Sequence, residues 1–248
     1  MKVSVITVCF NSEEYIEECI QSVHLQKYNN IEHIIIDGGS TDSTLRKIRN
    51  RLRPTDLLIS EPDNGIYDAM NKGLSYASGE IVGFLNSDDV FAEGNCIQEF
   101  VSKFDNDKLD CVYGDIAYVK RDDIKKIIRV WANSSHSIQD LKLGWIPPHP
   151  TFYLRRKLAL ETGGFSQKLK LAADFEFMFK LLKQKNIKSG YIDKVCVFMR
   201  VGGVTNNSIL NILRQNIEIL SVIKQHYSLL NTTLFFMFKL QKRLSQFK

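Results

Sequence analysis

The chain has 248 residues, of which 44% are hydrophobic and 25% are charged. This length and composition suit one α/β domain with additions, or two small domains, around a sizeable core. The formal net charge of +5 fits an anionic substrate or a membrane surface. The sequence has no arginine-rich arm and no zinc-finger spacing, which argues against nucleic acid binding.

The cysteines and the first residues indicate the compartment. Five cysteines stand at scattered positions without a CxxC pair, which favours free thiols and argues against a disulfide framework or a structural zinc site. The apolar run in residues 1–10 is too short for a secretory signal, and a strand explains it better. No run of about 18 apolar residues occurs, so we expect no transmembrane helix and a cytoplasmic protein.

The first half of the chain alternates between strands and helices. Strands are predicted at 3–10, 31–37, 56–60 and 80–86, and helices at about 15–23, after 41 and at about 66–77. Asn11 or Ser12 is the expected cap of the first helix, and Thr41 or Asp42 that of the second. Such alternation predicts a parallel sheet that is covered by helices on both faces.

The pattern changes after about residue 105. We expect longer strands at 109–119 and 124–132, a proline-rich loop leading into a strand at 144–154, a helix at 173–184, a strand at 189–200 and an amphipathic helix at 208–227. The sequence thus predicts an α/β fold with a nucleotide-type half (about 1–105), an elaborating half (about 106–205) and a C-terminal helical extension (206–248).

Polar and acidic side chains follow the predicted strands where these end. They are Asn11 after the first strand, Asp37 after the second, Asp63 after the third, and Asn86, Asp88 and Asp89 after the fourth. Ligands of open α/β sheets bind beyond the carboxyl ends of the strands, so these groups are expected to converge. No glycine-rich phosphate loop is present, but carboxylates can hold a divalent cation that binds diphosphate oxygens.

Four segments together resemble the family 2 glycosyltransferases with the GT-A fold. They are VSVITVCFNSEEYIEECIQSV, IEHIIIDGGSTDST, DNGIYDAMNKGLSYASGEIVGFLNSDD and GGFSQKLKLAADFEF, in the family's order from about residue 2 to about 183. The resemblance implies a Rossmann-like, mainly parallel sheet flanked by helices, with a mixed acceptor-side half and C-terminal helices. The subgroup that the chain most resembles makes bacterial surface polysaccharides, such as exopolysaccharide or O-antigen repeat units.

The resemblance also implies where the donor binds. The loop after the first strand would border the nucleotide base, Asp37 would hydrogen-bond the base, and two further side chains would lie near the base and diphosphate. The bordering residues are Thr7, Cys9 and Asn11, and the two further side chains are Asp63 and Lys72. Without the resemblance, Asp37 before Gly-Gly is also ordinary turn chemistry, and Cys9 packs as a small apolar residue.

The family's metal motif, Asp-x-Asp, here reads Asn86-Ser87-Asp88. Asn86 can still hydrogen-bond a ribose hydroxyl but brings no charge. The resemblance therefore implies Mn²⁺ or Mg²⁺ on Asp88, with Asp89 as the second ligand, and these two roles are exchangeable by one residue of register. The alternative is that both acids form a solvated strand exit or a helix cap.

The family's catalytic base corresponds to Asp174 in the pair Ala173-Asp174, at a predicted helix start. A sugar hydroxyl needs its proton removed as it attacks, and one base opposite the leaving group implies inversion. Glu176 is less favoured, because it should face another side of the same helix. Asp174 also suits the simpler role of a helix cap.

Four further side chains are weaker candidates. His149, between two prolines, and Trp145 are acceptor-side candidates, and Arg200 beside Gly-Gly is a candidate for a loop that closes over diphosphate. A lone histidine is more often structural, and an arginine beside a turn is more often a surface residue. Trp131 and Trp145 either stack on an acceptor sugar or belong to the core.

The C-terminal stretch LLNTTLFFMFKLQKRLSQFK combines apolar residues with Lys239, Lys242, Arg243 and Lys248 and has no acid. It is too short to span a bilayer but suits a membrane interface, with its cations on anionic lipid. The alternatives are a terminal helix packed on the domain and a dimer contact. Membrane contact would place the protein at the inner face of the cell membrane.

These expectations combine into an inverting, metal-dependent glycosyltransferase with a nucleoside-diphosphate sugar donor, UDP-linked, and a lipid-linked glycan acceptor. One rival is a nucleotidyltransferase that makes the sugar nucleotide, but this class needs a basic glycine-rich N-terminal loop, and TVCFNSEEY is neither. The other rival is a non-catalytic nucleotide-sugar-binding scaffold, which the Asn86 replacement favours and the retained Asp88, Asp89 and Asp174 oppose.

Overall fold

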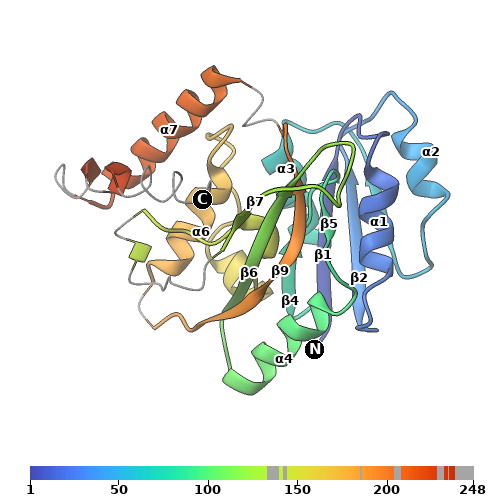
Figure 1. Cartoon of the computed structure of the whole chain (residues 1–248), viewed down its shortest axis with the longest axis horizontal. Coiled ribbons are helices and arrows are strands. Elements are labelled where there is room, and N and C mark those ends of the chain that lie inside the picture. The colour runs from blue at the N-terminus through green and yellow to red at the C-terminus, as the bar shows by residue number, and fades with distance from the viewer. Residues whose placement is uncertain are drawn as a thin grey trace.

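The structure is a computed structural model, and it describes residues 1–132, 140–141, 144–184, 186–203, 208–227, 232–233 and 235–237. Figure 1 shows a twisted sheet with helices packed around it and the last long helix, α7, at one side. The basic residues Lys239, Lys242, Arg243 and Lys248 lie outside the described residues. The predicted role of the C-terminal stretch therefore stays a prediction.

The first four strands are parallel neighbours in the order β3-β2-β1-β4. They are β1 (Val3–Cys9), β2 (Ile31–Asp37), β3 (Leu57–Ser60) and β4 (Ile81–Phe84). β1 and β2 end side by side, because Cys9 pairs with Asp37. The sheet therefore brings the loops that follow these strands to one edge, as the sequence predicts.

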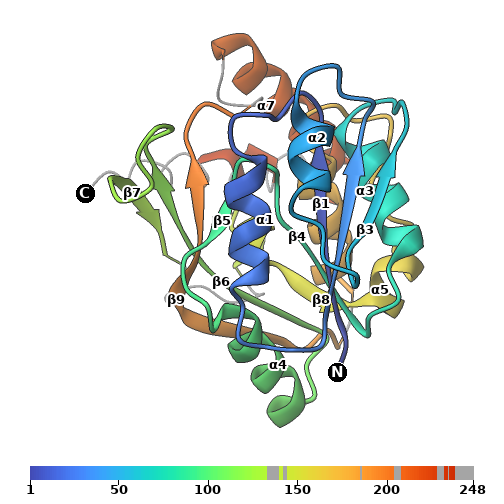
Figure 2. The ribbon, with the colours of Figure 1, turned by 90° about the vertical axis from the view of Figure 1, so that its right-hand side faces the viewer.

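Helices cover both faces of this parallel region. They are α1 (Ile16–His24), α2 (Thr44–Arg49) and α3 (Ile66–Tyr76). Apolar residues of α1 and α2 pack with Cys9 and Ile35 on one face, while α3 packs with Ile6 and Ile36 on the other. Figure 2 shows α1 and α2 in front of the strands. The alternation of apolar side chains along β1 and β2 supplies both faces.

The second half completes the sheet with mixed pairing. Its strands are β6 (Cys111–Val119), β7 (Ile127–Trp131), β8 (Tyr153–Arg155) and β9 (Ser189–Arg200), and β5 (Val90–Phe91), from the end of the first half, pairs with β9. The described strands form one nine-stranded sheet in which β8 joins β4 to β6, β6 and β9 are parallel, and β7 is antiparallel to β6. The predicted mixed half is confirmed, whereas no observation tests the predicted domain boundaries.

Three further helices cover the second half, and two shorter segments complete it. The helices are α4 (Cys96–Asp107), α6 (Ala173–Leu182) and α7 (Ile209–Lys224), and the shorter segments are α5 (Arg156–Glu161) and the 3₁₀ turn η2 (His149–Thr151). α6 is apolar on most of its surface and lies in the main core, where Ile219, Val222 and Ile223 of α7 pack against it. Within the described residues, no helix is both long and apolar enough to cross a membrane.

The predicted helix caps are partly wrong. α1 begins at Ile16 without a side-chain cap, and Asn11 instead adopts a positive φ of 47° and accepts a hydrogen bond from the Thr41 backbone N–H. Asp42 accepts from the Thr44 N–H at 2.9 Å, one residue before the cap position of α2. The polar residues after β1 therefore tie two loops together and do not close a helix end.

Candidate active site

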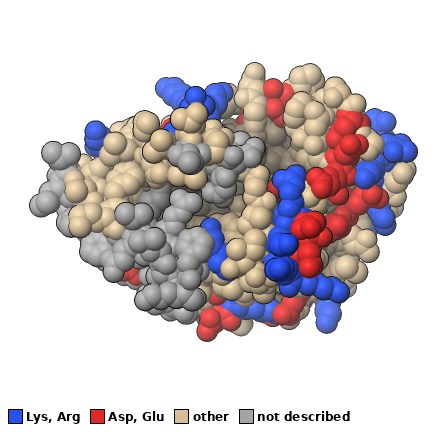
Figure 3. All heavy atoms as spheres, turned by 45° about the horizontal axis from the view of Figure 1, so that its top comes forward, with Lys and Arg blue, Asp and Glu red and all other residues tan. Residues whose placement is uncertain are grey.

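A cavity of about 1150 Å³ opens at the carboxyl ends of β1 and β4. Its walls come from the loops after β1 and β4, the first turns of α2, α3 and α6, and the turns that follow β6 and β9. Both halves of the chain thus contribute to one site. On the face in Figure 3, acidic and basic side chains lie next to one another over the part of the molecule that carries α1 and α2.

The structure brings together about half of the residues predicted from the sequence. The residues that line the cavity are Cys9, Asn11, Asp63, Asn86, Asp88, His149 and Asp174. Thr7, Asp37, Lys72, Asp89, Trp145 and Arg200 are not among the lining residues. The functional roles of all these residues remain predictions. Their positions distinguish the residues that line the cavity from those that lie behind its walls.

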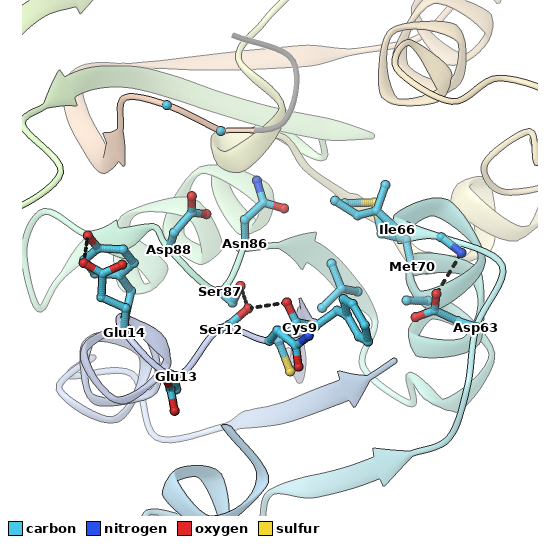
Figure 4. A pocket seen from close by; sticks show the side chains of 18 of the residues that line it. Cys9, Ser12, Glu13, Glu14, Asp63, Ile66, Met70, Asn86, Ser87 and Asp88 are labelled. Carbon is cyan, nitrogen blue, oxygen red and sulfur yellow. Dashed lines mark hydrogen bonds between the residues drawn. The ribbon is translucent and has the colours of Figure 1, made fainter. Parts of the chain in front are cut away.

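The loop after β4 presents two neighbouring side chains to the cavity. Figure 4 shows Asn86 and Asp88 pointing the same way into the cavity. Burial raises the pKa of Asp88. Asn86 Oδ1 is buried without a hydrogen-bond partner among the described residues. The unpaired Asn86 oxygen and the neighbouring Asp88 carboxylate together offer two hard oxygen ligands. They can accept a hydrogen bond or bind a cation.

Asp89 faces the interior and supports this loop. Its side chain is almost fully buried and accepts hydrogen bonds from the Arg200 backbone N–H and from Asn86 Nδ2, both at 3.3 Å. Burial, and then the neighbouring charge of Asp88, hold the pKa of Asp89 well above its usual value. The two adjacent acids therefore occupy different environments, and Asp88 is the one that reaches the cavity.

Arg200 holds the same loop from behind. Its side chain is 2% exposed and donates to the Asp88 carbonyl oxygen and, at 3.0 Å, to the Arg121 carbonyl oxygen. It also pairs with Glu18 and lies 4.4 Å over the centre of the Tyr15 ring. The guanidinium thus positions the backbone of the Asp88 loop in this structure, and its predicted closure over diphosphate stays a prediction.

Asp174 is the second residue of α6 and faces the cavity from the second half of the chain. Tyr67 Oη donates a 3.0 Å hydrogen bond to Asp174 Oδ1, and burial, followed by the charge of Asp174, raises the pKa of Tyr67. Glu176 instead pairs with Lys180 at 2.9 Å and is not a lining residue. Of the two acids, only Asp174 is therefore placed to reach a substrate in the cavity.

His149 forms part of the cavity wall near Asp174. Its ring stacks on Phe84 with 5.5 Å between centroids, and burial lowers its pKa against the opposing charge of Asp174. Nε2 is buried and has no hydrogen-bond partner among the described residues. A neutral imidazole with a free nitrogen at a cavity wall can bond a substrate hydroxyl.

Of the remaining predicted donor residues, Asp37, Thr7 and Lys72 act as supports in this structure, and Cys9 lines the cavity. Asp37 is fully buried and accepts from Ser40 N–H at 3.1 Å and Ser60 Oγ at 2.7 Å, which is the turn chemistry named as its alternative. Thr7 is buried against His33, and Lys72 pairs with Glu61 at 2.9 Å. Burial raises the pKa of the Cys9 thiol far above its usual range, so this thiol stays protonated.

The two tryptophans follow the core alternative. Trp145 is 2% exposed and its ring lies 5.4 Å from that of Tyr113, inside the main core. Trp131 is partly buried on β7 and packs against a second core cluster. Neither residue lines the cavity, so acceptor stacking by Trp145 has no support from its position.

Sequence reasoning missed several charged residues of the cavity wall. They are Glu13, Glu14, Arg46, Lys47, Arg121 and Lys170. Arg121 lies in the turn after β6, 3.4 Å from Glu14 and 5.0 Å over the Tyr15 ring. The turn carries no motif, and only the fold brings it to the loop after β1. Cations on this wall complement an anionic ligand.

Comparison with solved structures identifies the fold. TarS of S. aureus, residues 1–349 in complex with UDP-GlcNAc, superimposes with a TM-score of 0.70 at 21% identity, over 99% of this chain and 73% of that one. The mannosyltransferase PcManGT of Pyrobaculum calidifontis, in complex with GDP-Man and Mn²⁺, gives a TM-score of 0.69 at 19% identity, over 99% and 70%. These similarities confirm the predicted GT-A fold.

Sequence comparison identifies the family. An uncharacterized glycosyltransferase of Mycobacterium tuberculosis is 31% identical over 72% of this chain and 68% of its own length. Chondroitin synthase of Pasteurella multocida is 31% identical over 94% of this chain, which spans only 23% of that protein. The family model described as "Glycosyl transferase family 2" matches residues 4–171. The predicted enzyme class is confirmed, and the chain belongs to glycosyl transferase family 2.

Proposed function

We propose that this enzyme moves a sugar from a UDP-linked donor to a hydroxyl of a lipid-linked glycan in surface polysaccharide synthesis, with inversion at the sugar. The observation that carries the proposal is the placement of two carboxylates, Asp88 and Asp174, on the wall of one cavity from different halves of the chain. An inverting transferase needs positive charge beside the leaving diphosphate, which an acid can supply by holding a divalent cation, and a base beside the attacking hydroxyl.

We assign Asp174 as the general base. Its Oδ1 is held by Tyr67, which leaves Oδ2 to accept the proton of the acceptor hydroxyl. A fixed orientation matters because proton transfer requires hydrogen-bond contact with the attacking oxygen. With one base on one side of the reacting carbon and the diphosphate leaving on the other, direct displacement inverts the configuration. His149 Nε2 is a further group that can orient a sugar hydroxyl here.

The donor diphosphate would lie along the charged wall formed by Asp88 and the nearby cations. The oxygen atoms of Asp88 and Asn86 suit a hard divalent ion, and we assign Mn²⁺ or Mg²⁺ to them, with Asp89 as the alternative ligand. Such an ion would offset the negative charge of the departing nucleoside diphosphate. Arg121 and Lys47 line the same cavity and would add to that neutralisation.

We assign the nucleotide base to the loop after β1, between Cys9, Asn11 and Asp63. Asp37 would reach the base only by exchanging one of its present bonds to the turn. UDP is favoured because TarS binds UDP and UDP-GlcNAc, and GDP is the second candidate because the mannosyltransferase binds GDP-Man. Calorimetric titration with UDP, GDP, CDP and dTDP, each with and without Mn²⁺, tests both assignments.

Tight binding of one diphosphate only in the presence of Mn²⁺ would support the donor site and name the nucleotide. Asp88→Asn should then weaken the metal-dependent binding by at least about tenfold, because a charged ligand to the ion is lost. Glu93→Gln, a change at an acid that pairs with Lys194 and is not among the cavity residues, is the control. Binding of none of the four diphosphates by folded protein would favour a non-catalytic scaffold.

The assignment of the base has its own test. Asp174→Asn keeps the size of the side chain and the hydrogen bond of Tyr67 but cannot take a proton, so transfer should fall by about 100-fold or more while donor affinity stays unchanged. Glu176→Gln in the same helix is the matched control and should keep its activity. Transfer by purified Asp174→Asn at the wild-type rate would remove Asp174 from the mechanism.

The same proposal places the enzyme at a membrane surface. α7 exposes Leu210, Leu213 and Ile217, which are 64%, 54% and 65% exposed and lie on one helical face at a spacing of three and four residues. An apolar stripe of this kind suits the boundary between lipid headgroups and acyl chains. It would bring the cavity near a lipid-linked acceptor.

A further inference from the structure

A second group of metal-ligating side chains lies at the other end of the sheet from the cavity. His24 ends α1, His33 lies in the first half of β2, and Asp56 directly precedes β3. One candidate ligand atom from each residue lies within 4.8 Å of the other two. None of the three lines the cavity. Figure 2 shows α1, which carries His24, across the face of the strands.

Two of the three ligand atoms already lie close together. The Asp56 side chain is fully buried, and its Oδ2 is 2.8 Å from His24 Nε2. The same carboxylate is fixed by Arg53, whose backbone N–H donates to Oδ2 at 2.8 Å and whose Nη2 lies 3.4 Å from Oδ1. Two ligand atoms on one tetrahedral zinc ion lie about 3.4 Å apart. Only a small separation of His24 and Asp56 would therefore admit an ion.

His33 supplies the observation that points to a ligand. The residue is fully buried, and its Nε2 is held at 2.9 Å by Thr7 Oγ1. Nδ1 is also buried but has no hydrogen-bond partner among the described residues. A histidine with one nitrogen oriented by a hydrogen bond and the other left free has the arrangement of a metal ligand with its supporting contact.

We propose that His24 Nε2, His33 Nδ1 and Asp56 Oδ2 bind a Zn²⁺ ion. Two imidazoles and one carboxylate form a ligand set typical of zinc, whereas Mg²⁺ and Mn²⁺ favour oxygen ligands such as Asp88. The His24 side chain is 17% exposed, which gives the ion a path from solvent and leaves room for water as the fourth ligand. The ion would join α1, β2 and the turn before β3.

The proposed zinc site and the proposed cavity metal site use different residues, so they can be tested separately. Purified full-length protein, stripped with a chelator, is dialysed against Zn²⁺, and bound zinc is counted by elemental analysis. We expect one zinc ion per chain and a melting temperature that rises with Zn²⁺. Asp88→Asn should leave this ion in place, because Asp88 belongs to the cavity and not to the cluster. Zinc that is lost in Asp88→Asn and kept in His24→Gln would overturn the proposal.

Variants of the cluster complete the test. His24→Gln is the best first change, since this side chain is partly exposed and its loss should not prevent folding. It should weaken zinc binding by at least about tenfold. Removal of a residue that only supports a metal ligand already lowers metal affinity by about this factor, and His24 is a proposed ligand itself. His226→Gln, another partly buried histidine outside the cluster, is the matched control and should bind zinc as the wild type does.

Cobalt provides a readout that does not depend on stability. Co²⁺ in the wild-type protein should give the visible absorption of a tetrahedral nitrogen and oxygen site, and Asp56→Asn should remove it. Absence of a tetrahedral cobalt spectrum from the folded wild type would show that His24 and Asp56 only contact each other and that His33 is an ordinary buried histidine.

Discussion

At the scale of single residues, the hydrogen bond from Tyr67 Oη to Asp174 makes Tyr67 a positioning residue for the proposed base. Tyr67→Phe keeps the ring, which stacks on Phe165, and removes only the hydroxyl. A hydrogen bond to a charged group contributes about 1.5–3 kcal/mol, so kcat should fall roughly tenfold to a hundredfold with KM for the donor unchanged. Steady-state kinetics of Tyr67→Phe beside Tyr76→Phe, an exposed tyrosine of the same helix, measures this.

A rise in the KM for the donor, with kcat unchanged, would show instead that Tyr67 shapes the donor pocket and does not orient Asp174. Among single residues, Asn86 and Asp88 could be predicted as cavity residues because the ends of parallel strands meet at one sheet edge, whereas Asp174 was predicted only from the family resemblance. The inward position of Asp89 could not, since its bond to the Arg200 backbone depends on β9, 111 residues away in sequence. Arg121 was missed for the same reason.

At the scale of elements, the contact between β4 and β8 depends on the absence of a side chain at Gly83. A Cβ atom there would lie 2.2 Å from Cε1 of Tyr153, a fully buried ring that stacks on Phe100 at 4.6 Å. Gly83→Ala should therefore lower the free energy of unfolding by about 1–3 kcal/mol, the usual cost of overpacking. Urea denaturation measures it, with Gly203→Ala, where nothing lies within 4 Å, as the control.

If Gly83→Ala is as stable as the wild type, the Tyr153 ring must have an alternative position in the core.

The elements of this fold differ in how well the sequence predicts them. β1 and β2 could be predicted because both segments are rich in Val and Ile, and the structure buries all seven residues of β1 and six of the seven of β2. β5 has two residues and exists only through its pairing with β9, and α5 is too short for a helical period. α4 was missed although its buried residues recur at helical spacing.

The proposed membrane contact of α7 is also a property of an element. Leu213→Glu places a charge in the centre of the exposed stripe, and the loss of one buried leucine side chain corresponds to about 1.5–3 kcal/mol. Binding to vesicles of anionic lipid, measured by co-sedimentation, should fall about tenfold. Gln98→Glu adds the same charge on α4 and should bind as the wild type does. If both variants bind vesicles equally well, the apolar stripe of α7 does not contact lipid, and a contact with protein is the alternative.

At the scale of the whole molecule, the cavity joins the two halves of the chain. Cys9 and Asp88 come from the first half, and Arg121, His149 and Asp174 come from the second. A ligand that contacts both halves binds only the folded state, and at 100 times its Kd it stabilises that state by about 2.7 kcal/mol. For a chain of this size, the melting temperature should rise by about 5–10 °C with the correct nucleoside diphosphate and Mn²⁺.

Which segments of the chain the ligand stabilises tests the site more sharply than the size of the increase in melting temperature. Hydrogen exchange should slow at the first turn of α3 and at the first turn of α6, because these carry cavity walls from different halves. Asp88→Asn should abolish the part that requires Mn²⁺ and leave the zinc-dependent increase unchanged. Protection confined to the first half would mean that the nucleotide contacts only the loops after β1 and β4, and that Asp174 meets the acceptor without touching the donor.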